Sequence, residues 1–417
     1  MDLLYNFKRH YFNYLLSTIT PVIITAFSIP LFKHILGAEG YGRFSITFNS
    51  VLLCTAILSG WVWQSILRYF PASNHKHSFI SASLLISCLT QAIFLLPVLA
   101  AVWYIYNDFL LAVFFSVTLI ISSLQFSLLA ISQSVFLSKK SIYYELIRNV
   151  SYLTSVLVLL KCTSMYYMYA LFSATIISYL LSFLYLYVQT NKQLFANHSD
   201  ANGKENVKTI CRLFLFYGWP LSLWFVIALL ISLTDKYFIL KTAGAEVQGN
   251  YQALFDFLSK SIIVLLTPVN VSLFPLLTSA YQKGEKEDIK RLLLKIIGFE
   301  TVALILAVIV YWWFGADILF TIIKTPATLQ YKIMGLIIIA GTFIWQIAMV
   351  AHKRHELKYR SGYMLGMISI AFLFQLLLYL IFSKNTSQLI YPLGYLLSSF
   401  IYLFLVSIGQ VKSYFRR

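Results

Sequence analysis

Apolar runs of about 20 residues alternate with short polar segments along the whole chain. A run of this length crosses the hydrocarbon of a bilayer as a helix, whereas the strands of a membrane barrel alternate in segments of about ten residues. The pattern predicts about twelve membrane-spanning helices, at 11–36, 42–66, 79–105, 109–136, 143–160, 166–188, 211–240, 249–279, 292–314, 331–351, 361–382 and 388–411. The expected fold class is therefore an all-α integral membrane protein.

Composition agrees with this reading. The chain is 59% hydrophobic and only 11% charged, against about 25% charged residues in a soluble protein. Its net charge of +17 raises the question of a nucleic-acid partner. The basic residues fall in short loops between spans and form no continuous basic domain, so we expect no nucleic acid to bind.

The same basic residues predict the topology. With the N-terminus inside, the inner segments carry 23 of the 32 Lys and Arg residues and the outer segments carry seven. Short cytoplasmic loops are enriched in Lys and Arg, which makes this bias a measure of orientation. Both termini are predicted to be cytoplasmic, so the number of spans must be even.

A hydrophilic stretch and a repeated motif divide the chain in two. The predicted halves are an N-terminal six-helix half at 1–188 and a C-terminal six-helix half at 211–417, joined by a cytoplasmic linker at 189–210. The motif G-A-E-x-x-G occurs at 37–42 and again at 244–249, each time between the first and second span of its half, in a turn on the outer side. Two parallel repeats around a central cavity are the expected architecture.

Four charges lie where a membrane span should have none, namely Asp235 and Lys236 in the seventh span and Asp256 and Lys260 in the eighth. Ionisable residues at this depth face a bundle interior or a wet cavity. Asp256 and Lys260 are four residues apart, with the acid on the N-terminal side, the favourable orientation for a pair within a helix. The same helix face carries Gln252, Ser259, Thr267 and Asn270. The face is either a neutralised structural pair or one wall of a hydrated substrate cavity.

The other candidate charges leave alternatives open as well. Asp235 and Lys236 point about 100° apart on a helix. Lys236 either extends to the outer interface or serves the site, and Asp235 is expected to pair with Lys260. Arg43 and Arg68 stand at span ends, Arg68 either as an interface anchor or as a contact for phosphate.

Glu145 and Arg148 open the fifth span, where they are close enough in sequence to pair with each other.

No catalytic signature is present: the sequence contains no H-E-x-x-H, G-x-S-x-G or P-loop pattern. His352 and His355 are expected to belong to a basic inner loop rather than to bind a metal. We therefore expect no catalytic residues, no metal site and no cofactor, and a protein that is not an enzyme.

Three segments carry a resemblance to a known family. They are Leu36-Gly-Ala-Glu-Gly-Tyr-Gly-Arg43, Thr234-Asp-Lys-Tyr-Phe-Ile-Leu240 and Gly244-Ala-Glu-Val-Gln-Gly-Asn-Tyr251. With the arrangement of six and six spans, they resemble polysaccharide biosynthesis flippases of the O-antigen (Wzx) type. That type belongs to the multidrug/oligosaccharidyl-lipid/polysaccharide exporter superfamily, which includes the multidrug and toxin extrusion transporters.

The resemblance implies a function. The expected substrate is a lipid-linked oligosaccharide on a polyprenyl diphosphate, flipped across the bacterial cytoplasmic membrane by alternating access for surface polysaccharide assembly, with H⁺ or Na⁺ as a coupling ion. Polysaccharide polymerase and other assembly proteins are expected partners beside the bilayer itself. Lys260, Lys236, Arg43 and Arg68 would attract the diphosphate, with Asp256 and Asp235 holding the lysines until it arrives.

The sequence leaves two rival functions open. A cation-coupled drug antiporter of the same superfamily needs intramembrane acids in its first half, and the first three spans have no central Asp or Glu. A membrane-embedded polysaccharide polymerase or ligase needs a large outer loop, whereas the outer loops here are short, 312–331 being about the longest.

Overall fold

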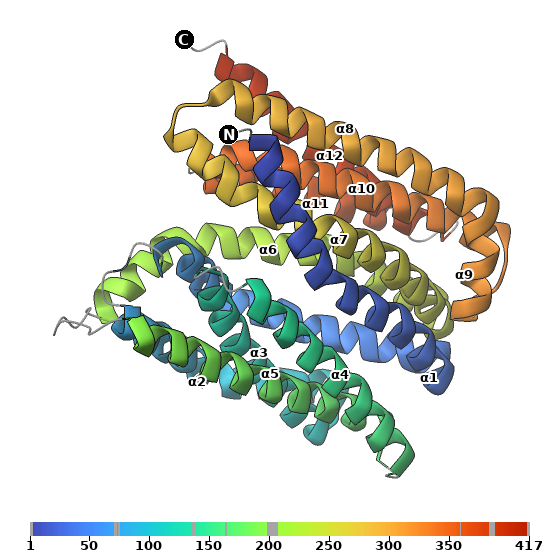
Figure 1. Cartoon of the computed structure of the whole chain (residues 1–417). Coiled ribbons are helices and arrows are strands. Elements are labelled where there is room, and N and C mark those ends of the chain that lie inside the picture. The colour runs from blue at the N-terminus through green and yellow to red at the C-terminus, as the bar shows by residue number, and fades with distance from the viewer. Residues whose placement is uncertain are drawn as a thin grey trace. The chain divides into compact units, whose positions relative to one another are not determined.

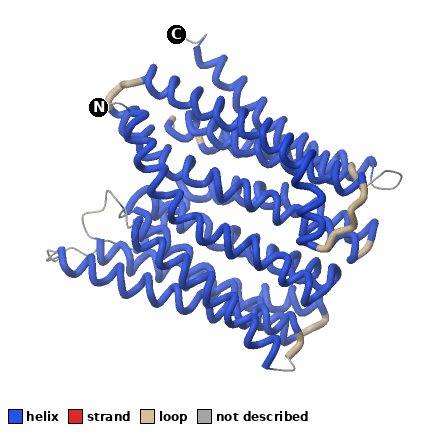
Figure 2. Tube along the Cα trace, turned by 45° about the vertical axis from the view of Figure 1, so that its right-hand side comes forward, coloured by secondary structure: helices blue, strands red, loops and turns tan. Residues whose placement is uncertain are grey.

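The computed structural model describes residues 3–70, 73, 76–134, 138–162, 165–197, 207–358, 360–382 and 388–414. Within these ranges the regular structure consists of helices (Figures 1 and 2). They are α1 (Leu3–Tyr69), α2 (Lys76–Tyr106), α3 (Phe109–Ser134), α4 (Ser138–Cys162), α5 (Tyr167–Asn197), α6 (Val207–Ala243), α7 (Ala245–Gln282), α8 (Lys286–Val310), the π turn η2 (Tyr311–Gly315), α9 (Ala316–Ile323), α10 (Leu329–Leu357), α11 (Ser361–Phe382) and α12 (Ile390–Tyr414). The predicted all-α membrane fold is confirmed.

Ten helical stretches in the described part of the chain are long and apolar enough to cross a membrane. This number differs from the predicted twelve for two reasons. The first two predicted spans fall in one stretch, Phe27–Tyr69, which a non-helical Gly37 divides. The fifth predicted span forms α4 but is too polar to be counted, because its first turns carry Glu145, Arg148 and Asn149.

Both copies of the repeated motif begin with a glycine that breaks the helix. Gly37 has φ 72° inside α1, and Gly244 has φ 88° between α6 and α7. A side chain strains this left-handed backbone, whereas glycine adopts it freely. The turns are therefore shorter than predicted: one residue changes the direction of the chain, and the rest of each motif is helical.

Two predicted irregular segments contain helix. The outer loop expected at 312–331 is occupied by η2 and α9, and it ends where Lys324 takes the left-handed conformation. The first part of the predicted linker at 189–210 belongs to α5, which continues to Asn197, and its last residues open α6 at Val207. Residues 198–206 of that linker lie outside the described residues.

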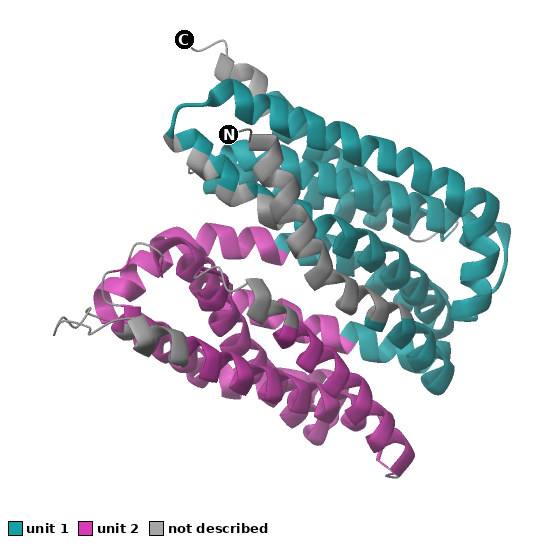
Figure 3. Cartoon of the chain, viewed as in Figure 1, with its two compact units in different colours: residues 1–46, 227–417 teal, residues 47–226 magenta. Residues whose placement is uncertain are grey.

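The chain forms two compact units (Figure 3). One comprises Met1–Ile46 with Ile227–Arg417 and the other comprises Thr47–Val226. Both boundaries between the units lie inside helices, in α1 and in α6, rather than in the linker. The predicted division into halves at 1–188 and 211–417 stays a prediction.

Polar groups hold the helices of the second unit together. Gln91 on α2 donates to Ser59 of α1 at 2.6 Å and to Ser123 of α3 at 2.9 Å. Ser87 and Ser127 form a further contact between α2 and α3 at 2.9 Å. Small polar residues let membrane helices approach closely and form hydrogen bonds across the interface. This explains why serines are frequent on the buried face of α3.

Candidate functional site

The two copies of the repeated motif contact each other inside the first unit. A Cβ placed on Gly42 would lie 2.9 Å from the Cα of Gly249, and a Cβ on Gly249 would overlap the backbone carbonyl of Ala38. The last glycine of each copy therefore allows α1 and α7 to cross with their backbones in contact. Motifs 207 residues apart in the sequence thus form one junction.

Asp256 lies about two turns of α7 beyond Gly249, and its carboxylate joins the two helices. One of its oxygens accepts a hydrogen bond from the Tyr41 hydroxyl at 2.7 Å and another from Ser45 at 3.4 Å, both from α1. Its other oxygen lies 3.2 Å from the ammonium of Lys260. Asp256 itself is buried. The predicted pair of Asp256 and Lys260 is present, and the contacts with α1 extend it into a link between the two motif-bearing helices.

Lys260 forms the accessible edge of this group. Its side chain is 48% exposed while that of Asp256 is 5% exposed. A basic side chain that keeps about half of its surface uncovered is open to a second anionic partner. Within one turn of α7, the acidic side chain is therefore buried, whereas the basic side chain is accessible to a ligand.

Two buried amides stand next to this carboxylate on α7. Gln248 donates to Gln252 at 3.5 Å, but the Oε1 of Gln248 has no hydrogen-bond partner among the described residues. A buried amide oxygen without a partner costs free energy comparable to a lost hydrogen bond. The group therefore has an unused acceptor, which suits a ligand rich in hydroxyls.

Asp235 and Lys236 have different partners from those expected. Asp235 is fully buried and accepts a hydrogen bond of 2.5 Å from Tyr251 of α7, so the predicted pairing of Asp235 with Lys260 is wrong. The reason is geometric, because Lys260 is already held by the acid one turn away on its own helix. Lys236 is buried as well, with its ammonium 4.0 Å from the ring centre of Phe255, a cation–π contact. It does not extend to the interface.

The remaining predicted residues have other partners. Asn270 donates to Gln346 of α10 at 3.0 Å, so the polar face of α7 contacts α1 near Asp256 and α10 near Asn270. Arg43 forms an exposed ion pair with Glu39 at 2.6 Å. Within the Thr47–Val226 unit, Arg68 lies over the ring of Tyr217, 5.6 Å from its centre.

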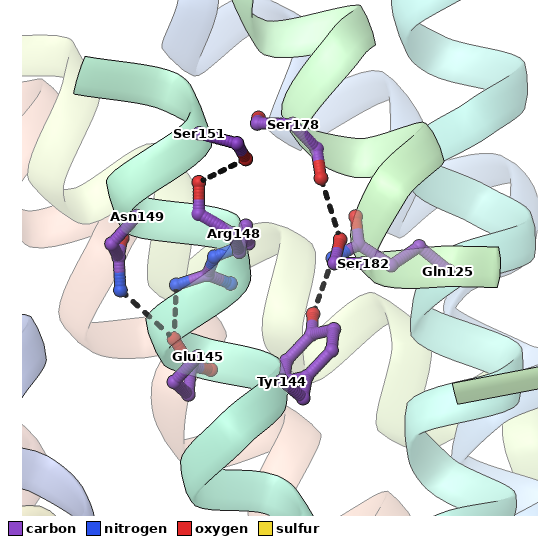
Figure 4. Close-up of polar contacts among 8 residues, drawn as sticks. All are labelled: Gln125, Tyr144, Glu145, Arg148, Asn149, Ser151, Ser178 and Ser182. Carbon is purple, nitrogen blue, oxygen red and sulfur yellow. Dashed lines mark hydrogen bonds and ion pairs between the residues drawn. The ribbon is translucent and has the colours of Figure 1, made fainter. Parts of the chain in front are cut away.

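A second polar cluster joins α3, α4 and α5 within the Thr47–Val226 unit (Figure 4). Glu145 accepts from Arg148 at 2.6 Å and from Asn149 at 3.3 Å, which confirms the predicted pairing. Gln125 of α3 donates to the Tyr144 hydroxyl and, at 3.3 Å, to Ser182 of α5. Since the ion pair is satisfied within α4, we interpret this cluster as packing that neutralises charge inside the membrane.

The histidines of α10 were wrongly predicted to lie in a loop. His352 and His355 belong to the helix and are both buried. His352 contacts the Tyr402 hydroxyl at 3.1 Å and His355 contacts the carbonyl of Val406 at 3.2 Å. Both therefore join α10 to α12.

Three site features escaped the sequence reading. Tyr41 and Tyr251, the hydroxyl partners of the two buried acids, are two of 29 tyrosines and carry no local signal. Glu300 of α8 is fully buried, and its signal was present, since an acid interrupts the apolar run of the ninth predicted span.

Comparison with known proteins was made by sequence and by structure. A family model described as polysaccharide biosynthesis protein matches residues 7–281. No curated protein matches the chain.

Solved structures of similar fold are membrane transporters. A mutant of the MATE transporter VcmN from Vibrio cholerae has a TM-score of 0.76 at 11% identity, covering 99% of this chain and 97% of that one. An inward-facing multidrug resistance MATE transporter of the MOP superfamily has a TM-score of 0.70 at 12% identity, covering 100% and 98%. A MOP superfamily transporter from Pyrococcus furiosus, described as having a binding pocket of reversed polarity, has a TM-score of 0.71 at 12% identity, covering 98% and 96%. At such identities the likeness shows the fold alone.

Proposed function

Because the chain belongs to the family of polysaccharide biosynthesis proteins, we propose that it is a flippase of the O-antigen type. Its substrate is a lipid-linked oligosaccharide on a polyprenyl diphosphate, which it moves from the cytoplasmic to the outer leaflet of a bacterial cytoplasmic membrane. Each sugar hydroxyl is costly in hydrocarbon, so the headgroup needs a polar route while the lipid tail stays in the bilayer. The shared fold with MOP transporters supports this proposal.

The observation that carries the proposal is the unequal exposure of the pair on α7. Lys260 has a half-exposed side chain at membrane depth, and Asp256 is buried and accepts a hydrogen bond from Tyr41 of α1. A diphosphate attracts the ammonium as a point charge and displaces the carboxylate from it. Asp256 then keeps its hydrogen bonds from Tyr41 and Ser45, so it is not left without partners. The unpartnered amide oxygen of Gln248 offers an acceptor to the sugar hydroxyls.

The remaining features of the proposal concern orientation and partners. Both termini face the cytoplasm, as the basic inner loops require, and those loops are the surfaces on which a polymerase or another assembly protein would bind. The cycle alternates access to the headgroup from the two sides and takes its energy from an H⁺ or Na⁺ gradient.

The test is the position of lipid-linked oligosaccharide when the protein is depleted in its host. We expect complete repeat units to accumulate on the inner leaflet and polymer to disappear from the surface. Complementation with Lys260→Ala or Asp256→Ala should restore export about tenfold less well than the wild type, a loss of about 1.4 kcal/mol in the transport barrier. Lys283→Ala, at an exposed lysine near the inner end of α7, is the matched control. Normal export by both site variants would refute the proposed role of this pair.

The same depletion separates the rival functions. Normal surface polymer with altered drug sensitivity would indicate a cation-coupled drug antiporter, which the fold of multidrug transporters favours. Single repeat units that reach the outer leaflet but stay unpolymerised would indicate a membrane-embedded polymerase or ligase.

A further inference from the structure

Glu300 occupies a position on the buried face of α8 where the helical spacing predicts an apolar side chain. The buried residues of α8 are Ile289, Leu292, Leu293, Ile296 and Glu300, spaced three and four apart as one face of a helix. The first four pack with Leu273 and Val350 in one apolar cluster contributed by α7, α8 and α10. Glu300 continues this stripe one turn further into the membrane.

Its carboxyl group has no partner. Glu300 is 0% exposed, and neither side-chain oxygen makes a hydrogen bond to the described residues. No ion pair to it is formed within that part of the chain. A charged carboxylate left in this state is among the most costly arrangements in a membrane protein.

The register of the helices brings amide groups to the same level. Gly335 of α10 lies against the ring of Tyr311, which fixes the level of one helix against the other. Glu300 lies eleven residues before Tyr311 in the chain. Gln346 lies eleven residues after Gly335 on the antiparallel helix, so Glu300 and Gln346 are at about the same level. Gln346 accepts a hydrogen bond from Asn270 of α7. The Oδ1 of Asn270 makes no hydrogen bond within the described part of the chain. Three adjoining helices therefore each place one polar side chain at this level, above an apolar cluster.

Other ionisable groups on the neighbouring helices are engaged elsewhere. On α7, Asp256 and Lys260 pair with each other, and Lys260 is about 15 Å along the axis from Asn270 at 1.5 Å per residue. On α10, His352 and His355 contact α12. At the outer end of the same face, the hydroxyl of Tyr311 makes no hydrogen bond to the part of the chain that the structure describes. Glu300 therefore supplies a single negative charge at the level of Asn270 and Gln346.

We propose that Glu300, with the amide oxygens of Asn270 and Gln346, forms a binding site for one monovalent cation, Na⁺ or a proton. Carboxylate and amide oxygens are the ligands that hard cations prefer. One carboxylate neutralises one positive charge, whereas a divalent ion would leave an uncompensated charge in hydrocarbon. Cation binding here is independent of the transported substrate; only its use to drive transport rests on the proposed function.

The test uses the purified full chain in lipid nanodiscs without any oligosaccharide. Saturable binding of ²²Na⁺ is measured for the wild type, Glu300→Gln and Asn270→Leu, with Glu287→Gln, at an exposed acid in the first turn of α8, as the matched control. Infrared spectra over a range of pH record the carbonyl band of a protonated carboxyl group in the same samples.

Two results support the site and distinguish the ion. Saturable Na⁺ binding that is lost in Glu300→Gln, weakened about tenfold in Asn270→Leu and kept in Glu287→Gln identifies Na⁺; a tenfold change corresponds to about 1.4 kcal/mol. Absence of Na⁺ binding together with a pH-dependent carboxyl band that Glu300→Gln removes identifies the proton. If the wild type shows neither signal, or if Glu300→Gln, eluting as a monodisperse protein, retains both, the proposal is overturned.

Discussion

At the scale of single residues, each of the two acids of the candidate site accepts a hydrogen bond from a tyrosine hydroxyl. Asp256 accepts from Tyr41 and Asp235 accepts from Tyr251. Hydrogen bonds to a charged group contribute more than neutral ones, and a tyrosine hydroxyl supplies such a bond without adding a second buried charge. The remaining partners differ. Asp256 also has Ser45 and the ion pair with Lys260. Asp235 has one further hydrogen bond, from the backbone N–H of Lys236, and the nearby charge of the Lys236 side chain.

This difference predicts unequal effects of removing the hydroxyls. Tyr251→Phe should lower the free energy of unfolding by about 1–3 kcal/mol, because Asp235 stays buried with the backbone N–H of Lys236 as its remaining hydrogen-bond donor. Tyr41→Phe should have a smaller effect, since Asp256 keeps Ser45 and Lys260. The measurement is the midpoint of thermal unfolding in detergent, with Tyr281→Phe, at an exposed tyrosine, as the control. A larger loss in Tyr41→Phe than in Tyr251→Phe would contradict this account of the two carboxylates.

The sequence predicted part of this chemistry, and the missing part has a physical cause. Asp256 and Lys260 are four residues apart on a helix, so their pairing follows from local geometry. Tyr41 is 215 residues from Asp256, and no periodicity relates residues on helices that meet only after folding. The expected pairing of Asp235 with Lys260 failed because it matched charges by sign alone, without the competition from a carboxylate on the same helix.

At the scale of elements, the crossing of α1 and α7 depends on close backbone contact at two glycines. At Gly249 a Cβ would overlap the carbonyl of Ala38, which cannot move without displacing α1. At Gly42 part of the overlap involves the side chain of Gln248, which can rotate. The two positions of one repeated motif therefore differ in tolerance.

We predict that Gly249→Ala separates α1 from α7 and reduces both folded yield and export, and that Gly42→Ala is milder. Gly366 of α11 meets no neighbouring atom within 4 Å, and Gly366→Ala is the control, expected to be neutral or to stabilise the helix by up to about 1 kcal/mol. Yield of monodisperse protein and export in complemented cells are the two readouts. Equal tolerance of Ala at 249 and 366 would show that the backbones do not need to touch.

Helix positions were predictable from the apolar runs because hydrocarbon leaves a spanning chain little other choice than a helix. What the runs could not predict is how little chain a reversal needs. Turns of several residues were expected at 37–42 and 241–249, yet one glycine with positive φ ends each helix. The loop expected at 312–331 forms η2 and α9 because its residues are largely apolar, and a helix completes their backbone hydrogen bonds internally.

At the scale of the whole molecule, the number of crossings determines on which side the C-terminus lies. Ten stretches qualify by length and composition. If α4 crosses as well, there are eleven, and the termini lie on opposite sides. If Gly37 also reverses the chain, there are twelve, and the termini return to the same side. A straight helix of 67 residues would be about 100 Å long at 1.5 Å per residue, far beyond the bilayer's hydrocarbon thickness of about 30 Å. The reversal at Gly37 is therefore expected.

Reporter fusions test this count directly. A reporter that is active only in the cytoplasm should be active when fused after Gly284 or at the C-terminus, and inactive when fused after Asn107 or Thr325. A reporter that is active only outside should give the opposite pattern. The reason is the excess of basic residues in the segments assigned to the inside, 23 of 32, which resist translocation. A C-terminus on the outer side, with Gly284 inside, would mean an odd number of crossings after α7 and would require reassignment of α8 to α12. Opposite activities at Asn107 and Gly284 with a cytoplasmic C-terminus would establish that α4 spans the membrane, because the chain must cross an odd number of times between those two positions, and α3, α5, α6 and α7 alone supply an even number.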